Sequence, residues 1–136
     1  MNSVEPQKPQ SIQYPSRTAE RAERALRCSP FRLNLFSAMR SQSIELKAIA
    51  SSSGVENGYA SSPVAELAAE NYLLWLIQVG VLRREVDGQG ITDSFRLTPL
   101  GRQLVEKWEQ QGGCLPPPSG SDRLTNQIGR WFRLPF

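Results

Sequence analysis

The stretch from residue 79 to residue 104, VGVLRREVDGQGITDSFRLTPLGRQL, constrains the fold of this chain more than any other. An apolar helix ends at Gly80, and a hairpin with a glycine-rich turn at residues 87–90 follows. The predicted strands are Val81–Val86 and Ile91–Leu97. Thr98 then supplies a helix cap and Pro99 a first-turn proline. This order predicts a helix, a two-stranded ribbon and a second helix in succession.

The remaining helices are predicted from apolar spacing at helical period and from capping residues. We expect them over Arg17–Cys28, from Ser29-Pro30 through Met39, over Ile44–Ser52, over Pro63–Val79 and from Pro99 to about Gln111. The expected core stripes are Phe31, Leu35, Phe36 and Met39; Leu46, Ile49 and Ala50; and Leu100, Leu104, Val105 and Trp108. The chain is therefore predicted to be mostly α-helical with a small two-stranded β wing.

Composition divides the chain into four parts. Residues 1–16 are rich in Pro, Gln and Ser and are predicted to be a disordered arm. The folded domain is expected over residues 17–111, followed by a Gly/Pro linker at 112–121 and an amphipathic docking tail at 122–136. Net charge is +4 over residues 1–47, −3 over 48–82, zero over 83–111 and +2 over 112–136, so the basic surplus lies toward the ends.

Three segments carry a resemblance to a known fold family. They are LKAIASSSGV (Leu46–Val55), LLWLIQVGVLRRE (Leu73–Glu85) and FRLTPLGRQL (Phe95–Leu104). Together they resemble the winged helix-turn-helix superfamily of prokaryotic regulators over roughly residues 31–111. The same region is similar to the dimerisation domains of small-molecule O-methyltransferases, and the whole chain resembles a family of small conserved cyanobacterial proteins. The resemblance implies a winged-helix fold, and fold does not choose between DNA binding and protein interaction.

The long helix at residues 63–79 distinguishes DNA binding from protein interaction, because a winged helix that reads DNA places this helix in the major groove. The superfamily pattern turns Ala69, Tyr72, Leu73, Leu76 and Ile77 toward the core, which leaves Glu66, Glu70, Asn71, Leu74, Trp75 and Gln78 on the other face. No Lys or Arg lies between Lys47 and Arg83. A helix that is apolar on both sides is normally buried on both sides. The cover over Leu67, Leu74 and Trp75 could be the chain's own first helix or tail, or a protein interface with a partner or a second copy.

The tail places large apolar side chains at helical spacing among arginines. The apolar residues are Leu124, Ile128, Trp131 and Phe132, and the arginines are Arg123, Arg130 and Arg133. Such a segment can dock on its own domain, in the groove of a partner, or on an anionic membrane surface, and we favour docking on protein over lipid. The predicted partner-binding residues are therefore Leu67, Leu74, Trp75, Ile128, Trp131 and Phe132.

Nucleic-acid binding is the alternative, and its candidate contacts are six arginines. They are Arg17, Arg21 and Arg24 on one face of the first helix, with Arg83, Arg84 and Arg96 on the strands. Strand alternation sends Arg83 and Arg84 to opposite faces, and nearby glutamates can pair with the helical arginines. Solvated surface charge is therefore the favoured interpretation of these residues.

Catalytic chemistry finds no support in the sequence. The chain has no histidine, and its two cysteines, Cys28 and Cys114, are far apart and are expected to be reduced thiols. No nucleophile elbow, P-loop, dinucleotide-binding or zinc-protease motif is present. We therefore expect no catalytic residues, cofactor, metal or small-molecule substrate.

The N-terminus lacks the apolar region of a secretory signal and no run is long enough to span a membrane, so a cytoplasmic location is expected. The sequence favours a non-enzymatic interaction or regulatory module, with a DNA-binding transcriptional regulator as the alternative.

Overall fold

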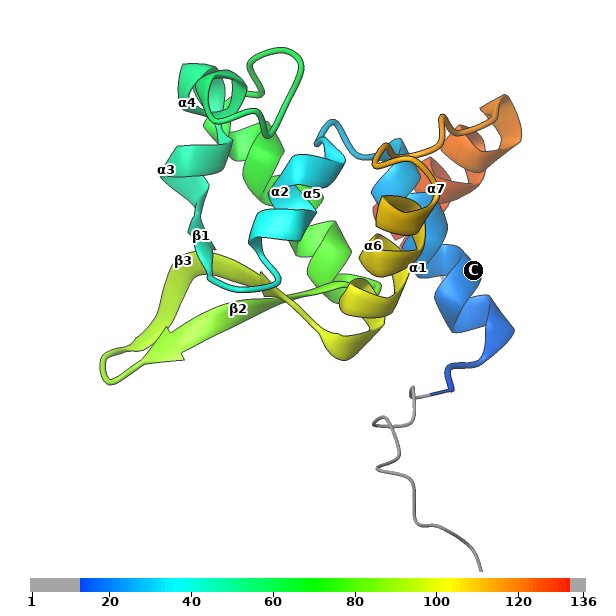
Figure 1. The fold of residues 1–136 in the computed structure, drawn as a ribbon, viewed down its shortest axis with the longest axis horizontal. Coiled ribbons are helices and arrows are strands. Elements are labelled where there is room, and N and C mark those ends of the chain that lie inside the picture. The colour runs from blue at the N-terminus through cyan, green and yellow to red at the C-terminus, as the bar shows by residue number, and fades with distance from the viewer. Residues whose placement is uncertain (1–12, 133–136) are drawn as a thin grey trace, which may run out of the picture.

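In the computed structural model, residues 13–132 are described, and they form a group of packed helices with a small sheet at one end (Figure 1). The helices are α1 (Ser16–Cys28), α2 (Leu33–Ala38), α3 (Leu46–Ile49), α4 (Ser51–Glu56), α5 (Glu66–Gln78), α6 (Pro99–Gln110) and α7 (Gly120–Phe132); the strands are β1 (Ile44–Glu45), β2 (Leu82–Asp87) and β3 (Gly90–Leu97). The first and last helices, α1 and α7, lie side by side at one end of the molecule, and the β2–β3 hairpin projects at the other end (Figure 1). The predicted mostly helical architecture with a small antiparallel sheet is confirmed.

The sheet has three strands in the order β1-β3-β2, all antiparallel. The β2–β3 hairpin was predicted, and its register pairs Leu82 with Leu97, with a bulge between Arg84 and Val86. The third strand was not predicted, because Ile44 was expected to begin a helix. Ile44 instead pairs with Phe95 of β3 and is buried beside it, so the wing is a three-stranded sheet rather than a two-stranded one.

The single helix predicted over Ile44–Ser52 is wrong, since the structure divides this region into β1, α3 and α4. Ala50 is extended, with ψ of 161°, and Ser51 follows with φ of +58°, which breaks the helical path. The Ser51 N–H donates to the Val64 carbonyl at 2.7 Å, so a contact from a distant part of the chain holds the break. Gly54 was expected to end the helix but lies inside α4, where any Cβ would lie 1.9 Å from the Ile49 carbonyl oxygen.

The entry to α6 follows the sequence prediction closely. Thr98 caps the helix by accepting a hydrogen bond from the Gly101 N–H at 3.1 Å, and Pro99 occupies the first turn. Gly80, with φ of +91°, follows the end of α5 as predicted. These two junctions fix the hairpin between α5 and α6.

The core contains the predicted stripes of α2, α3 and α6 in full. The largest side chains that are almost completely buried include Trp108, Phe36, Phe95, Leu35, Met39 and Ile49. Phe31 is also buried, but it forms a bridge with Ala60 before α2 begins, so this helix starts later than predicted. Residues 1–12 of the predicted arm lie outside the described residues, whereas Tyr14 packs against the core. Over residues 13–132, no helix is both long and apolar enough to cross a membrane.

Candidate interaction surface at α5 and α7

The tail forms a regular helix, α7, and its start is fixed by a reciprocal cap that the sequence analysis missed. The Asp122 N–H donates to Ser119 Oγ, and the Ser119 N–H donates to Asp122 Oδ2, each at 3.1 Å. The Ser-x-x-Asp spacing at residues 119–122 is the sequence signal for this cap. The helix therefore begins at Gly120, inside the stretch that was predicted to be linker.

Three side-chain contacts dock α7 onto the domain. Trp75 Nε1 of α5 donates to Asn126 Oδ1 at 2.9 Å in a buried position. Arg27 of α1 pairs with Asp122 at 3.0 Å. The Arg130 guanidinium lies 4.5 Å from the centre of the Tyr72 ring. The tail thus docks on its own domain, one of the outcomes that the sequence left open.

The orientation of α7 is unusual for an amphipathic helix, because its polar and small residues face inward. Asn126 and Gly129 are the buried positions. Leu124 is 60% exposed and Trp131 is 70% exposed, seven residues apart on the same outer face. Ile128 is half-buried between the two faces, and the Phe132 side chain lies outside the described residues. The apolar stripe of α7 therefore points away from the domain that the helix packs against.

The structure buries α5 on two sides and leaves a third side open. Ala69, Leu73 and Leu76 face the core as predicted, with Tyr72 and Ile77 half-buried. The prediction that Trp75 faces outward toward a partner is wrong for the folded chain, since it is only 5% exposed beneath α7. Leu67 and Leu74, however, remain 72% and 41% exposed beside it.

A groove of about 630 Å³ runs between the open side of α5 and the C-terminal half of α7. Its lining is apolar and aromatic with a few polar groups, namely Ala68, Asn71, Tyr72, Leu74, Trp75, Ile77, Gln78, Arg130 and Trp131. Arg130 is the charged residue in this lining. The structure therefore brings together Leu74, Trp75 and Trp131 of the predicted partner-binding set around one depression.

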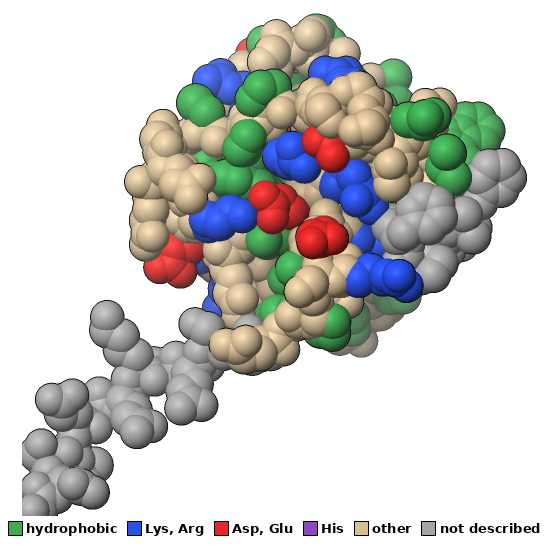
Figure 2. All heavy atoms as spheres, turned by 90° about the vertical axis from the view of Figure 1, so that its right-hand side faces the viewer, with side chains coloured by type: hydrophobic (Ala, Val, Ile, Leu, Met, Phe, Trp, Pro, Cys, Tyr) green, Lys and Arg blue, Asp and Glu red, His purple; other side chains and the backbone are tan. Residues whose placement is uncertain are grey.

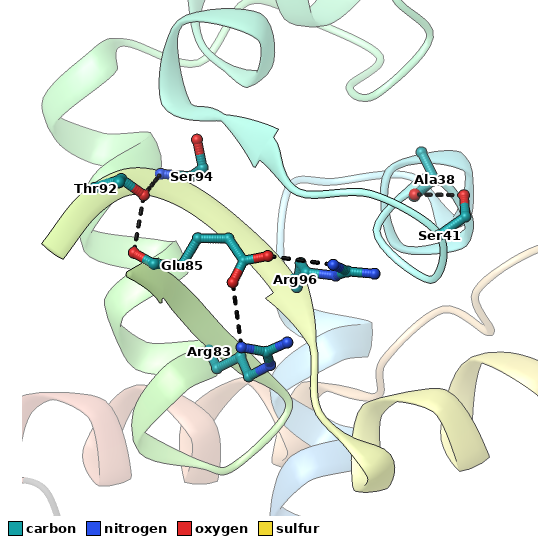
Figure 3. A network of polar contacts seen from close by, with 7 residues as sticks. All are labelled: Ala38, Ser41, Arg83, Glu85, Thr92, Ser94 and Arg96. Atoms are coloured by element: carbon teal, nitrogen blue, oxygen red, sulfur yellow. Dashed lines mark hydrogen bonds and ion pairs between the residues drawn. The ribbon is translucent and has the colours of Figure 1, made fainter. Parts of the chain in front are cut away.

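The strand arginines are engaged with protein groups. Arg83 and Arg96 are cross-strand partners, and the Glu85 carboxylate bridges them at 3.2 and 3.3 Å (Figure 3). Arg84 lies on the opposite face, as strand alternation predicts, with its guanidinium 5.2 Å from the centre of the Phe95 ring. The three arginines do not form one surface, because two share a carboxylate on one side of the hairpin and the third packs on the other side.

The α1 arginines are similarly mixed with acidic groups. Arg21 donates to the Gln78 carbonyl at 3.4 Å, whereas Arg17 is exposed. Arg24 is half-buried. Glu23 pairs with Lys107 of α6 at 3.0 Å. Lys/Arg and Asp/Glu side chains are interspersed over the end of the molecule that carries α1 and α7, and hydrophobic side chains gather at its upper right edge (Figure 2). This face therefore presents no continuous basic patch.

Cys28 and Cys114 are both free thiols. Burial, reinforced by the charge of Asp122, raises the pKa of the Cys28 thiol above its ordinary value, so the thiol is protonated near neutral pH. Within the part of the chain that the structure describes, no cluster of Cys, Asp and Glu side chains could hold a metal ion.

A family model described as Npun_F0494-like matches residues 12–130, which include both α5 and most of α7. Neither the curated proteins nor the solved structures contain a significant match to the chain. The family match extends from the residue before the described segment almost to the end of the docked tail helix. The chain therefore belongs to the Npun_F0494-like family.

Proposed function

We propose that this protein is a non-enzymatic protein-interaction module with a winged-helix fold, and that it binds its partner through α5 and α7. The observation that carries the proposal is the outward apolar stripe of α7, with Leu124 and Trp131 exposed. Leu74, which lines the groove, and Leu67, seven residues earlier on α5, add exposed apolar area. Protein interfaces are typically centred on large apolar and aromatic side chains of this kind.

The winged-helix assignment is supported by the order of elements. Helices α2 to α5 precede the β2–β3 hairpin, α6 follows it, and β1 adds the third strand. In a winged helix of this order, α5 would occupy the position of the recognition helix.

DNA binding by α5 is less well supported by its exposed side chains. The open side carries the exposed Leu67, Leu74 and Glu66 with the half-buried Glu70, and residues 48–82 contain no Lys or Arg. Contacts to phosphates and base edges require donors that this face lacks, apart from the Asn71 and Gln78 amides. The alternative of a DNA-binding regulator therefore depends on Arg17, Arg21, Arg24, Arg83, Arg84 and Arg96, several of which bind other parts of the chain.

The interaction proposal is tested by using the wild-type chain and three variants, each changed at one exposed apolar residue, to capture binding partners. Leu74→Glu and Trp131→Glu place a charge at the proposed surface, and Ile91→Glu, at a residue that is 73% exposed on the hairpin, is the matched control. We expect the wild-type and Ile91→Glu chains to retain the same specific partner, and the other two to lose it. A partner retained equally by all four chains would contradict the proposal.

The DNA alternative is tested by titrating salt against random duplex DNA. We expect no binding even at low salt. Micromolar binding that collapses as salt rises, and that weakens when the six arginines are replaced, would favour the regulator instead.

A further inference from the structure

We infer that the surface formed by α5 and α7 is occupied by a second copy of this chain, in a two-fold symmetric dimer. This inference rests on the proposed function and specifies the partner. It is carried by the arrangement of charge around the apolar residues, which makes the surface complementary to itself.

The residues on the open side of α5 form parallel rows along the helix, and the exposed amides of Asn71 and Gln78 lie between the leucines and Trp75. Leu67 and Leu74 are seven residues apart and form the exposed central row. Glu66 and Glu70 lie to one side of this row. Ala68 and Trp75 lie to the other side, where they line the groove beside α7. The acidic row and α7 therefore flank the leucine row on opposite sides.

The α7 side of the surface is basic. Arg130 lines the groove, and its neighbour Trp131 is 70% exposed. Within residues 13–132, neither Glu66 nor Glu70 is within ion-pair distance of a Lys or Arg side chain. Among the described residues, one edge of the apolar surface is thus acidic with no basic partner, and the other edge carries Arg130, whose guanidinium lies over the Tyr72 ring.

Two-fold symmetry brings these edges together. In an interface between identical surfaces, a residue that contacts another is contacted in return by that residue's symmetry mate. One possible two-fold axis lies between the two copies and is parallel to α5. With this axis, the acidic row of each copy faces Arg130 of the other copy, and the two leucine rows meet on the axis. An axis across α5 would bring the two acidic rows together, where like charges repel. Charge therefore selects parallel α5 helices.

The first experiment is sedimentation equilibrium of the full chain over a range of concentrations. We expect a dimer of about twice the 15.2 kDa chain mass. Trp131→Glu and Leu74→Glu should weaken it by at least about a hundredfold, as loss of a central apolar contact does. Ile91→Glu, which also adds a charge at an exposed apolar residue, should leave it unchanged. A monomer throughout, or equal loss with all three variants, would overturn the inference.

Charge reversal tests the orientation of the two copies. Glu70→Arg should weaken the dimer by about tenfold, and adding Arg130→Glu should restore it. Arg130→Glu also removes the contact of Arg130 with the Tyr72 ring, so circular dichroism confirms that each variant is folded and hydrogen exchange of α7 amides confirms that α7 remains docked. Failure of the double variant to recover affinity, while its helical content equals that of the wild type, would overturn the assigned orientation.

Cysteine cross-linking gives an independent test in a chain with Cys28→Ser and Cys114→Ser. Leu67→Cys and Leu74→Cys should each form a symmetric disulfide, since each residue meets its own counterpart on the axis. The two variants are then mixed. If Leu67→Cys chains form disulfides only with Leu74→Cys chains, the α5 helices are antiparallel and the proposed axis is wrong.

Two outcomes separate this inference from the function on which it rests. A monomeric chain that still captures a different protein in a manner sensitive to Trp131→Glu would overturn the dimer and leave the interaction module standing. A full chain that is monomeric but dimerises when residues 133–136 are removed would show that these residues occupy the groove, and would overturn the inference for the intact protein.

Discussion

Helices α6 and α7 are amphipathic, nearly equal in length and adjacent in the chain, yet they point their apolar faces in opposite directions. In α6, Leu100, Leu104, Val105 and Trp108 are buried in the core. In α7, Leu124 and Trp131 are exposed, and the buried positions are Asn126 and Gly129. Periodicity identifies an apolar face on both helices, but it does not determine what that face contacts.

The two apolar faces contribute differently to the stability of the folded chain. The α6 stripe is part of the contiguous core, so its apolar area is removed from water when the chain folds. The exposed α7 residues contribute little to folding, because their apolar area remains in contact with water in the folded chain. Substitutions in the two helices should therefore act on different measurements.

The largest expected difference is between the two tryptophans. Trp108→Ala should lower the free energy of unfolding by about 3–5 kcal/mol, because it leaves a large cavity in a packed core. Trp131→Ala, at a site that is 70% exposed, should change it by no more than about 0.5 kcal/mol when both chains are measured at a concentration low enough to be monomeric. Urea denaturation followed by circular dichroism measures both. Comparable losses in the two variants would show that α7 is as much a part of the core as α6.

The next effect concerns the buried hydrogen bond that docks α7. Asn126→Ala removes the acceptor of the Trp75 indole N–H and leaves that donor unpaired in a buried position. We expect α7 docking to weaken by about 1–3 kcal/mol. Hydrogen exchange of α7 amides should accelerate while that of α6 amides remains slow. Gln127→Ala, at the exposed neighbouring position, is the control and should change neither helix.

Acid should loosen α7 before α6. Hydrogen bonds from Ser119, with the charge of Arg27, hold the pKa of Asp122 below its ordinary value in the folded chain. The contribution of the ionised carboxylate is complete above the ordinary Asp pKa of about 4 and is lost as pH falls through the lower folded value. Exchange of α7 amides, corrected for the intrinsic effect of pH, measures this. In Asp122→Asn, α7 amides should exchange faster at neutral pH, and acid should cause no further increase. If acid still accelerates exchange in this variant, another group is responsible for the acid response.

The smallest effect is on the reactivity of the two thiols. Burial and Asp122 raise the pKa of Cys28, whereas Cys114 is exposed in the segment between α6 and α7. We expect iodoacetamide to modify Cys114 faster at pH 7.5, since the thiolate is the reactive form. Peptide mass spectrometry over time distinguishes the sites. Asn126→Ala should accelerate modification of Cys28 if undocking of α7 exposes the thiol. Equal modification rates for Cys28 and Cys114 in the wild-type chain would contradict the burial of Cys28.

Local sequence signals determined most of the fold. The hairpin, its glycine-rich turn, the Thr98 cap and the core stripes of α2 and α6 depend on neighbouring residues, whose spacing sets which side chains share a face. The Ser119–Asp122 cap was also available in the sequence and would have placed the start of α7 correctly. The sequence likewise indicated that α5 is apolar on more than one side.

Contacts between distant residues decided the rest. The break at Ala50–Ser51 depends on a hydrogen bond to Val64, and β1 depends on pairing with Phe95, so neither follows from local propensity. Trp75 is buried because Asn126, 51 residues away, accepts its N–H. With Asn126 on its inner face, α7 has its apolar stripe facing outward. The sequence by itself established that the tail is amphipathic, and only tertiary packing determined which of its faces remains available to a partner, because a helix can dock through any face that satisfies its buried polar groups.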